Sequence, residues 1–536
     1  MKLKTSNRIQ ANQIDRSSAA FHTGFTLVEM IVSVALVLLM MLMFTEIFQI
    51  LSGSMTTQRG ISENDQRERL LVTVMQADLD NRTFQYLLPF ANYIDFTTPA
   101  DTKPASTDPR SPEYYKADRK GYFYISENDP NDDTDDILQF TVSTFSDPSQ
   151  DDDTEGFYYG RANMDHDFIA EDYKKLSKHP NQPDADDAQL EKIDPVSGKV
   201  ITNLTAQSSA AEITYFLRGS NLYRRELLIR EPLTITGVTN SQPEAADGIT
   251  YFLRPSGTSP DPHYSDDEHP DCNFWRDFDF SAFRYESTFT SGLFSARFHD
   301  LTDLDNSSPS TDYFPLGKPH YRFGFNHATG LSREYMTSSS ASNPQLFIGR
   351  FTHEETSHVN FNYPQDLMPA SLGGGGNPMD PSGPNLVVNS ETRVVDMLKN
   401  GPRRSEDLVL ANVRSFDIKV FDDRYQDFVD IGDPALPATA RFAAGAKQNA
   451  EAGNTEWKNV FDTWHPATSV GSEPNPPYPM LSDSAGLPLY DLANQSTQHY
   501  PSPLTAIRIL VRYEDPTSGQ VRQMTLIHPL RSRSEE

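Results

Sequence analysis

The stretch GFTLVEMIVSVALVLLMMLMFTEIFQIL, residues 24–51, decides the architecture of the N-terminal part of this chain. Fifteen successive residues from Met30 to Phe44 carry no charge, and Ser33 is the only polar one among them. Because a helix needs about 20 mostly apolar residues to cross a bilayer, this stretch predicts a transmembrane helix. Residues 1–24 carry four basic residues against one acidic residue, a net charge of +3. That charge predicts a cytoplasmic N-terminus and a periplasmic or otherwise extracytoplasmic remainder.

One carboxylate, Glu29, lies inside the apolar stretch. An acidic side chain near the bilayer centre costs about 2.5–3.5 kcal/mol on insertion scales, and such residues generally have a function. A plain membrane anchor, the first alternative, has no use for it. A cleaved secretory signal, the second, has a shorter apolar region followed by small residues, which Ser52-Gly53-Ser54 matches only loosely.

The hexapeptide GFTLVE, Gly24 to Glu29, resembles the signal of type IV pilins and pseudopilins. The basic leader, the Gly, the Phe-Thr-Leu-apolar-Glu pattern and the apolar helix all match, although the leader is longer than in many pilins. The resemblance implies cleavage after Gly24 by a prepilin peptidase and N-methylation of Phe25, the new N-terminus. It also implies that Glu29 meets the terminal amine of a neighbouring subunit and sets the axial register. The alternative is that Glu29 only extends toward the lipid headgroups.

The helix is expected to continue past the membrane through residues 52–88, because the first later proline is Pro89. Gly53 and Gly60 are expected to bend or loosen it. Apolar residues recur every four positions in its second half: Leu71, Met75 and Leu79. This spacing predicts an amphipathic half that packs on a globular head, as in pilins.

The remaining residues, 89–536, carry segments rich in β-branched and aromatic residues that predict strands. These segments are Gly121–Ser126, Ile137–Thr144, Glu212–Leu217, Leu222–Ile229, Leu408–Phe421 (one strand, or two joined by a bend), Leu504–Tyr513 and Val521–His528. We therefore predict an α+β fold, in which a long N-terminal helix packs on an antiparallel β-rich head. We expect a fragment from about residue 85 onward to be soluble and β-rich.

Large insertions interrupt the predicted strands at about 146–207, 232–404 and 431–503. The segment from Phe274 to Phe298 within the second insertion is densely aromatic. It predicts either a buried accessory core or an aromatic face that binds carbohydrate or a partner.

Several strand segments resemble those of one pilin-like group, the J-type minor pseudopilins of type II secretion systems. The matching blocks are Leu138-Gln139-Phe140-Thr141, Tyr215 with Leu222-Tyr223-Arg224, Leu410-Ala411-Asn412-Val413 and Ala506–Val511. Each block alone is weak evidence for the resemblance. Together the blocks extend the resemblance over about 150–200 residues beyond the N-terminal helix.

Composition and motifs disfavour several function classes. The chain has a net charge of −29, which becomes −32 after loss of the +3 leader, so we expect no nucleic-acid binding. A single cysteine, Cys272, excludes an intramolecular disulfide. The segment HEETSH, His353 to His358, fails the zinc-protease pattern because its histidines are five residues apart instead of four. We therefore expect no enzymatic activity and no catalytic residue.

One acidic loop allows weak calcium binding as a minor hypothesis. Oxygen-bearing residues alternate there as in the first half of an EF-hand loop: Asp129, Asn131, Asp133 and Asp135. The central glycine is missing, and Phe140 stands where the last ligand, a glutamate, belongs. A solvated acidic turn is the simpler interpretation, and we expect no other metal or cofactor.

Together these features predict a structural minor pseudopilin or pilin, at or near the tip of a type II secretion pseudopilus or a type IV pilus-like filament. Its expected partners are the other pilins, the prepilin peptidase and the inner-membrane assembly platform. Its expected location is the inner membrane, as a single-pass protein, and then the filament. The alternatives are a pilin-like surface adhesin, whose insertions bind a ligand, and a membrane-anchored periplasmic protein.

Overall fold

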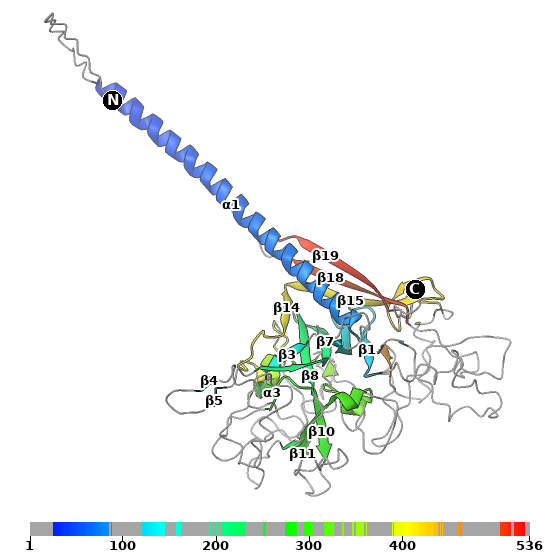
Figure 1. Cartoon of the computed structure of the whole chain (residues 1–536). Coiled ribbons are helices and arrows are strands. Elements are labelled where there is room, and N and C mark those ends of the chain that lie inside the picture. The colour runs from blue at the N-terminus through cyan, green and yellow to red at the C-terminus, as the bar shows by residue number, and fades with distance from the viewer. Residues whose placement is uncertain are drawn as a thin grey trace, which may run out of the picture. The chain divides into compact units, whose positions relative to one another are not determined.

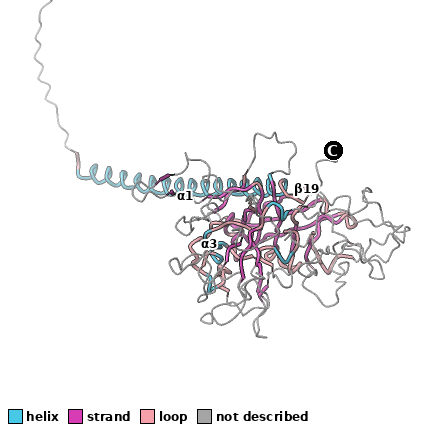
Figure 2. The backbone as a smooth tube through the Cα atoms, turned by 60° about the horizontal axis from the view of Figure 1, so that its bottom comes forward, coloured by secondary structure: helices cyan, strands magenta, loops and turns pink. Residues whose placement is uncertain are grey.

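The chain forms two compact units, Met1–Glu63 and Asn64–Glu536, which are treated separately below. A computed structural model describes residues 25–84, 87, 120–144, 157–161, 192–193, 200–201, 205–230, 250–252, 274–286, 294–304, 316–325, 335–336, 346–347, 350–358, 361, 388–389, 391–437, 440, 442, 459–463, 504–515 and 519–530. The strands all belong to the second unit, whereas the described part of the first is helical (Figure 2). This arrangement agrees with the predicted α+β class.

Helix α1, Leu27–Asp80, is a single helix of 54 residues (Figure 1). Helical hydrogen bonding continues through Gly53 and Gly60. Its segment Leu27–Gln49, 23 residues, is long and apolar enough to cross a membrane. The large apolar side chains of this segment are exposed, so an apolar environment has to be supplied from outside the chain.

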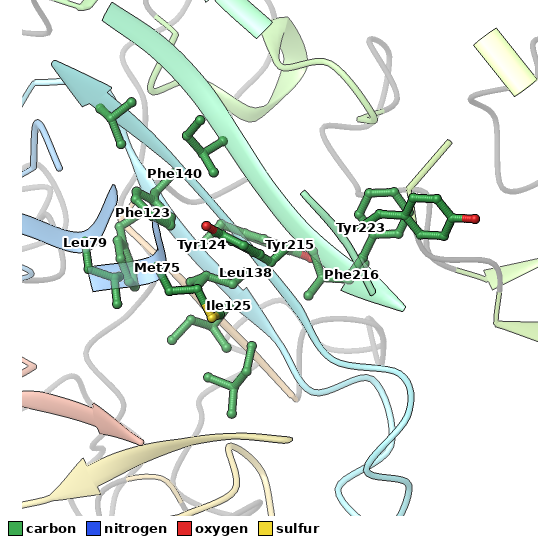
Figure 3. Packing of buried hydrophobic residues seen from close by; sticks show 14 of the residues in the cluster. Met75, Leu79, Phe123, Tyr124, Ile125, Leu138, Phe140, Tyr215, Phe216 and Tyr223 are labelled. Carbon is green, nitrogen blue, oxygen red and sulfur yellow. The ribbon is translucent and has the colours of Figure 1, made fainter. Parts of the chain in front are cut away.

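The second half of α1 provides one wall of the head's core. Leu71, Met75 and Leu79 are each only 1% exposed, which confirms the predicted apolar face. Met75 and Leu79 lie against Phe123 and Leu138 of the central sheet (Figure 3). Tertiary packing of this face, more than helix propensity, therefore fixes the end of α1 on the head.

The central sheet of the head is antiparallel and six-stranded, in the order β14-β8-β7-β2-β1-β17. Its strands are β1 (Phe123–Ser126), β2 (Ile137–Ser143), β7 (Ala210–Arg218), β8 (Asn221–Ile229), β14 (Leu408–Ala411) and β17 (Val460–Asp462). One face carries apolar residues toward α1. The opposite face carries tyrosine, glutamine, glutamate and arginine residues toward the second insertion.

A second antiparallel sheet has four strands in the order β16-β15-β18-β19. Its strands are β15 (Val413–Asp422), β16 (Asp427–Val429), β18 (Ala506–Glu514) and β19 (Val521–Pro529). Asn412 separates β14 from β15 with a left-handed φ of 59°, a conformation that asparagine tolerates better than most residues. The segment Leu408–Phe421 therefore forms two strands that belong to different sheets. All the other strand segments predicted from the sequence are confirmed within two residues.

The insertions contribute shorter elements. The small sheets are formed by β3 (Tyr158–Arg161) with β6 (Thr205–Ser208), β4 (Lys192–Ile193) with β5 (Val200–Ile201), β9 (Thr250–Phe252) with β10 (Ala282–Glu286) and β11 (Phe294–Phe298), and β12 (Tyr335–Met336) with β13 (Leu346–Phe347). The helical turns are α3 (Phe274–Asp277), α4 (His353–Thr356), η6 (Leu301–Leu304), η7 (Pro319–Tyr321) and η9 (Asp396–Leu398).

The aromatic side chains of the second insertion whose burial is described between residues 275 and 283 are interior. Trp275, Phe278 and Phe280 are at most 1% exposed and belong to the same core cluster as the central sheet. Backbone bonds join the two, since Leu228 donates to the carbonyl of Asp279 at 2.7 Å. These aromatic residues therefore extend the main core instead of forming a separate accessory core or an exposed binding face.

Because α1 completes the core, a soluble head fragment has to begin at Asn64 and not near residue 85. In such a fragment, we expect Met75→Ala to lower the free energy of unfolding by about 2–5 kcal/mol, since it leaves a cavity beside the central sheet. Gln76→Ala, at the next and exposed position, should change it by less than about 0.5 kcal/mol. Urea unfolding followed by circular dichroism measures both values. Equal effects of the two substitutions would contradict the packing described for α1.

Candidate functional site

The predicted processing site lies at the N-terminal end of α1. Gly24 lies outside the described residues. Phe25, the expected new N-terminus, is 81% exposed and precedes the helix. Nothing within the described chain therefore covers the residue that would carry the terminal amine.

Glu29 closes the first turn of α1 in a reciprocal hydrogen-bond pattern. Its Oε2 accepts from the backbone N–H of Thr26 at 3.0 Å and from the Thr26 hydroxyl, also at 3.0 Å. Thr26 Oγ1 in turn accepts from the backbone N–H of Glu29 at 3.3 Å. This is a capping box, in which a Thr and a Glu three residues later satisfy each other's backbone donors.

Both hydrogen bonds to the Glu29 carboxylate fall on one oxygen. Within the described part of the chain, Oε1 accepts none, and the side chain is exposed. The capping box thus fixes where the carboxylate lies and leaves its second oxygen available to an external donor. A cationic amine is the donor that a carboxylate in an apolar environment binds most strongly.

The two hydroxyl side chains of the apolar segment form local hydrogen bonds. The Ser33 hydroxyl donates to the carbonyl of Met30 at 2.9 Å, and the Thr45 hydroxyl donates to that of Met41 at 2.8 Å. Such bonds to the preceding turn allow a hydroxyl to lie in an apolar medium. Glu29 differs from both because its carboxylate retains an unused acceptor.

A polar contact within the second unit joins the end of α1 to the central sheet. Asp78 accepts from the Tyr215 hydroxyl at 2.5 Å and from Nε and Nη2 of Arg224 at 2.7 and 2.9 Å. Burial, followed by the nearby Asp78 carboxylate, raises the pKa of Tyr215 well above its ordinary value, so the hydroxyl remains a donor. The contact orients α1 on the sheet in a way that apolar packing alone does not.

The sheet face opposite α1 is a buried polar layer. Gln139 donates to Glu212 and to the Tyr122 hydroxyl at 2.5 and 2.7 Å, and it accepts from Nε of Arg350 at 2.8 Å. Arg322 of this layer makes a bidentate contact with Asp462 at 2.8 and 3.0 Å, whereas Arg225 donates to the carbonyl of Phe351 at 2.6 Å and to the Thr356 hydroxyl at 3.1 Å. The layer links the sheet to the second insertion through specific hydrogen bonds.

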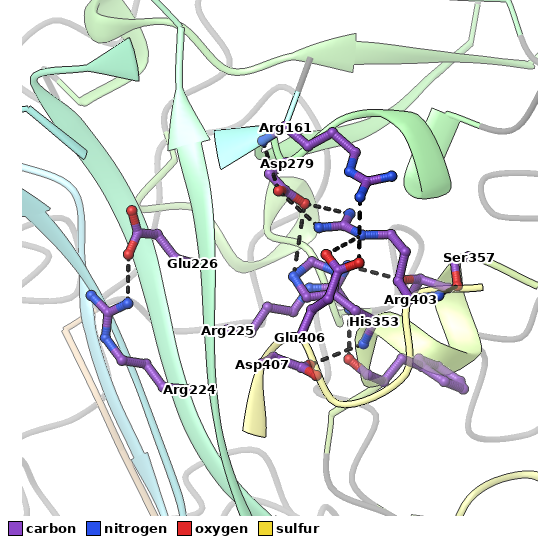
Figure 4. Close-up of polar contacts among 12 residues, drawn as sticks. Arg161, Arg224, Arg225, Glu226, Asp279, His353, Ser357, Arg403, Glu406 and Asp407 are labelled. Atoms are coloured by element: carbon purple, nitrogen blue, oxygen red, sulfur yellow. Dashed lines mark hydrogen bonds and ion pairs between the residues drawn. The ribbon is translucent and has the colours of Figure 1, made fainter. Parts of the chain in front are cut away.

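A second group of charged residues gathers between α4 and the loop after η9 (Figure 4). Arg403 binds both carboxylate oxygens of Asp279, at 2.5 and 2.9 Å, and its Nε donates to Glu406 at 2.8 Å. Asp279 also accepts from the backbone N–H of Arg161 at 2.8 Å. These bonds fasten β3 and the second insertion to the loop before β14.

His353, the first residue of the HEETSH segment, is buried in this group. Its Nε2 lies 3.7 Å from Asp279 Oδ1. Burial, followed by the positive charges of Arg225 and Arg403, holds the pKa of His353 well below its ordinary value. The imidazole is therefore neutral, and its approach to Asp279 is not an ion pair. Its backbone N–H donates to Asp407 Oδ2 at 2.9 Å.

The rest of HEETSH has a structural role as well. Thr352 and Glu355 form a capping box at the start of α4, and Glu355 also pairs with the fully buried Arg218 of β7. Among the described residues, no three His, Cys, Asp or Glu side chains are arranged to hold a metal ion. The glutamate that would follow the first histidine of the zinc pattern, Glu354, instead accepts from the backbone N–H of Asn400 at 2.7 Å.

The acidic loop considered for calcium uses its side chains locally. Asp129 Oδ1 accepts from the backbone and the side-chain amide of Asn131 at 3.0 and 2.9 Å, and Asp135 Oδ2 accepts from the backbone N–H of Asp129 at 3.1 Å. Asp133 lies 3.5 Å from Arg512. The loop therefore forms turns that its own side chains stabilise.

The sequence patterns gave no sign of the ion pairs around Asp279 and Glu355. Each pair joins residues more than 100 positions apart, such as Asp279 with Arg403 and Arg218 with Glu355. A basic residue within a strand such as EITYFLR was the available signal, since an arginine on an inward-facing position needs a buried partner. Cys272 lies outside the described residues.

Comparisons of this chain with models of protein families, with curated proteins and with solved structures found no match.

The buried carboxyl group of Asp407, which lies in the group around His353, makes the free energy of unfolding depend on pH. Burial raises the pKa of Asp407 from 3.8 to about 6. The folded state therefore holds this proton to a higher pH than the unfolded state does, and stability falls as pH rises between about 4 and 6. Over this interval the proton on Asp407 accounts for a fall in the free energy of unfolding on the order of 3 kcal/mol. We expect Asp407→Asn to abolish that fall. Urea unfolding at a series of pH values measures the slope, and identical slopes in the unchanged protein and in Asp407→Asn would contradict the assignment.

Proposed function

We propose that this chain is a structural minor pseudopilin or minor pilin, which is matured by a prepilin peptidase and assembled into a type II secretion pseudopilus or a type IV pilus-like filament. Before assembly it would lie in the inner membrane, with its leader in the cytoplasm and its head in the periplasm. The observation that carries the proposal is the GFTLVE signal directly before a 23-residue apolar helix segment whose glutamate keeps one oxygen free.

The physical argument concerns two charges in an apolar bundle. Cleavage after Gly24 would leave a positive amine on Phe25, and packing of the helices would place it among apolar side chains. An unpaired charge in such a place costs several kcal/mol, which a carboxylate partner offsets. Glu29 of this chain fits that role toward the terminal amine of a neighbouring subunit, because its capping box fixes its position and Oε1 accepts no hydrogen bond from the described residues.

The size of the head supports a position at or near the filament tip. A shaft subunit has neighbours on all sides, so large additions to its head would collide with them. Here the three predicted insertions, at about 146–207, 232–404 and 431–503, account for more than half of the head's length. A subunit at the tip has free space above it, and additions there meet no neighbour.

The negative net charge of the chain argues against a role in DNA uptake. It is compatible with a role in filament assembly. The mature chain carries a net charge of −32, so a duplex would be repelled. The partners expected from the proposal are other pilin-like subunits, the peptidase and the assembly platform of the inner membrane.

The processing step is tested by mass spectrometry of the mature N-terminus. We expect the chain to begin at Phe25 and to carry one additional methyl group. Gly24→Trp should block cleavage, because the peptidase has to accommodate the backbone at that position, whereas Ser18→Trp in the leader should not. A mature chain that begins at Met1, or one cleaved near Ser54, would overturn the proposed function.

The register role of Glu29 is tested by co-purification with partner pilins. We expect Glu29→Val to be cleaved and methylated normally, and to remain in the membrane because a costly carboxylate is gone. Its recovery with partners should fall roughly 100-fold or more, since loss of one member of a buried pair costs about 3–5 kcal/mol. Glu46→Val removes the other carboxylate near the end of the apolar segment and serves as the matched control. Normal recovery of Glu29→Val would contradict the register role and leave the processing claim intact.

A further inference from the structure

One sheet edge of the head differs from the others. Among the described strands, the two larger sheets end in β14, β17, β16 and β19. β16 and β17 have three residues each, and β14 has four with a shift in register. β19 has nine residues and pairs with β18 in unbroken register along its whole length, at the edge of its sheet (Figure 1).

Several devices that normally protect an edge strand are absent from β19, and the charge of its Arg522 is paired with Asp65. Protection comes from short length, a bulge, lysine or an internal proline. The sequence VRQMTLIHP contains no lysine, and its single proline is the last residue, Pro529. Its outward side chains include Val521 and Ile527, which are 61% and 57% exposed.

The opposite side of β19 is held firmly. Met524, Leu526 and His528 are buried in the core. Arg522 pairs with Asp65 of α1, and the carbonyl of Leu530 accepts from Arg82 at 2.7 Å. The strand is therefore fixed in an extended form, and the peptide groups of its outer edge, which pair with no described strand, are aligned for another strand.

The charge around β19 indicates the chemistry of the partner. The chain has 75 acidic and 46 basic residues, yet β19 contains no acidic residue. Arg512 of β18 donates from Nε to Oε1 of Gln523, its cross-strand partner on β19, at 3.1 Å, so a positive charge lies beside the middle of β19. Its side chain is 47% exposed, and its contact with Asp133 at 3.5 Å is a partly exposed pair of small energy.

We propose that an extended segment of a neighbouring pilin subunit adds a strand to the free edge of β19. The added strand would place apolar β-branched or aromatic residues beside Val521 and Ile527, and a carboxylate beside Gln523 within reach of Arg512. A second copy of this chain fits less well, because it would bring two acid-free edges, each with its own Arg512, together. The inference rests on the proposed function in one respect, the identity of the partner as a filament subunit.

Hydrogen exchange followed by mass spectrometry tests the added strand directly. The full mature chain is purified in detergent micelles, alone and after co-expression with each protein of the same source that carries a Gly-Phe-Thr-Leu-type signal. We expect the edge-facing amides in peptides covering residues 521–529 to exchange at least tenfold more slowly in the complex than in the isolated chain. Peptides covering β16, the short edge of the same sheet, should exchange equally in both samples and serve as the internal control.

The outcomes separate this inference from the proposed function. A complex that forms through correctly processed subunits without a change at residues 521–529 overturns the edge assignment and leaves the pilin proposal standing. Failure to find the processed N-terminus overturns both. Slow exchange of the same amides in the isolated chain, together with a dimeric mass, would show that a second copy occupies the edge and would overturn the choice of partner.

A lysine at the edge provides an independent check. We expect Ile527→Lys to lower recovery of the partner at least tenfold, since edge lysines oppose strand addition. Tyr425→Lys, at a similarly exposed position in the turn between β15 and β16, should leave recovery unchanged. Both variants should show the same thermal unfolding as the unchanged chain, and equal recovery of the two would overturn the assignment.

Discussion

The burial of one face of the last turns of α1 is the constraint on which the rest of the head depends. Leu71, Met75 and Leu79 fill the apolar face of the central sheet, and Asp78 binds Tyr215 and Arg224 of the same sheet. The same helix begins with a segment whose apolar side chains are exposed among the residues that the structure describes. A single helix thus contains one part that needs a protein core and another that needs a membrane or a bundle of helices. Neither part is stable in water without its own apolar surroundings, so the proposed subunit has to pass from one apolar environment to another.

The central sheet has two faces with different chemistry, and this difference explains the form of the head. The face toward α1 is apolar and gains its stability from area removed from water. The opposite face carries Gln139, Glu212 and Arg218, which would suit contact with water, but the second insertion covers them. Burying such groups costs free energy unless each finds a partner, and here the insertion supplies Glu355 for Arg218 and Arg350 for Gln139. The insertion is therefore joined to the sheet by specific polar pairs, which fix its position more narrowly than apolar contact does.

Local patterns were sufficient to predict much of the fold. The four-residue spacing of Leu71, Met75 and Leu79 identified the buried helix face, and the run from Ala506 to Glu514 showed a strand through its β-branched residues. The polar sites were not predictable in the same way. Glu355 lies in the HEETSH segment, which fails the zinc-protease pattern, and nothing in that segment indicated its partner, Arg218, 137 residues earlier. A pattern within ten residues reports periodicity and turns, but it carries no information about which distant charge will neutralise a buried arginine. For the same reason the sequence identified Glu29 as a functional candidate but did not show that its hydrogen bonds use only one of its two oxygens.

The two surfaces proposed for assembly would determine different properties of the filament: Glu29 the axial position of the subunit, and β19 the identity of its partner. A carboxylate and an amine that meet in an apolar bundle fix the axial position of one helix against another, because any displacement leaves both charges unpaired. That contact alone does not distinguish between subunits, since every pilin with the same signal would offer the same amine. A strand added at β19 would contact a row of side chains, so its affinity would depend on its own sequence. The edge could therefore discriminate between partners. Because Arg522 and Asp65 link β19 to α1 within the second unit, a partner bound at the edge would also be placed relative to the end of the helix. In this arrangement the helix would determine the axial position of the subunit in the filament, and the sheet edge would determine which other subunit binds next to it.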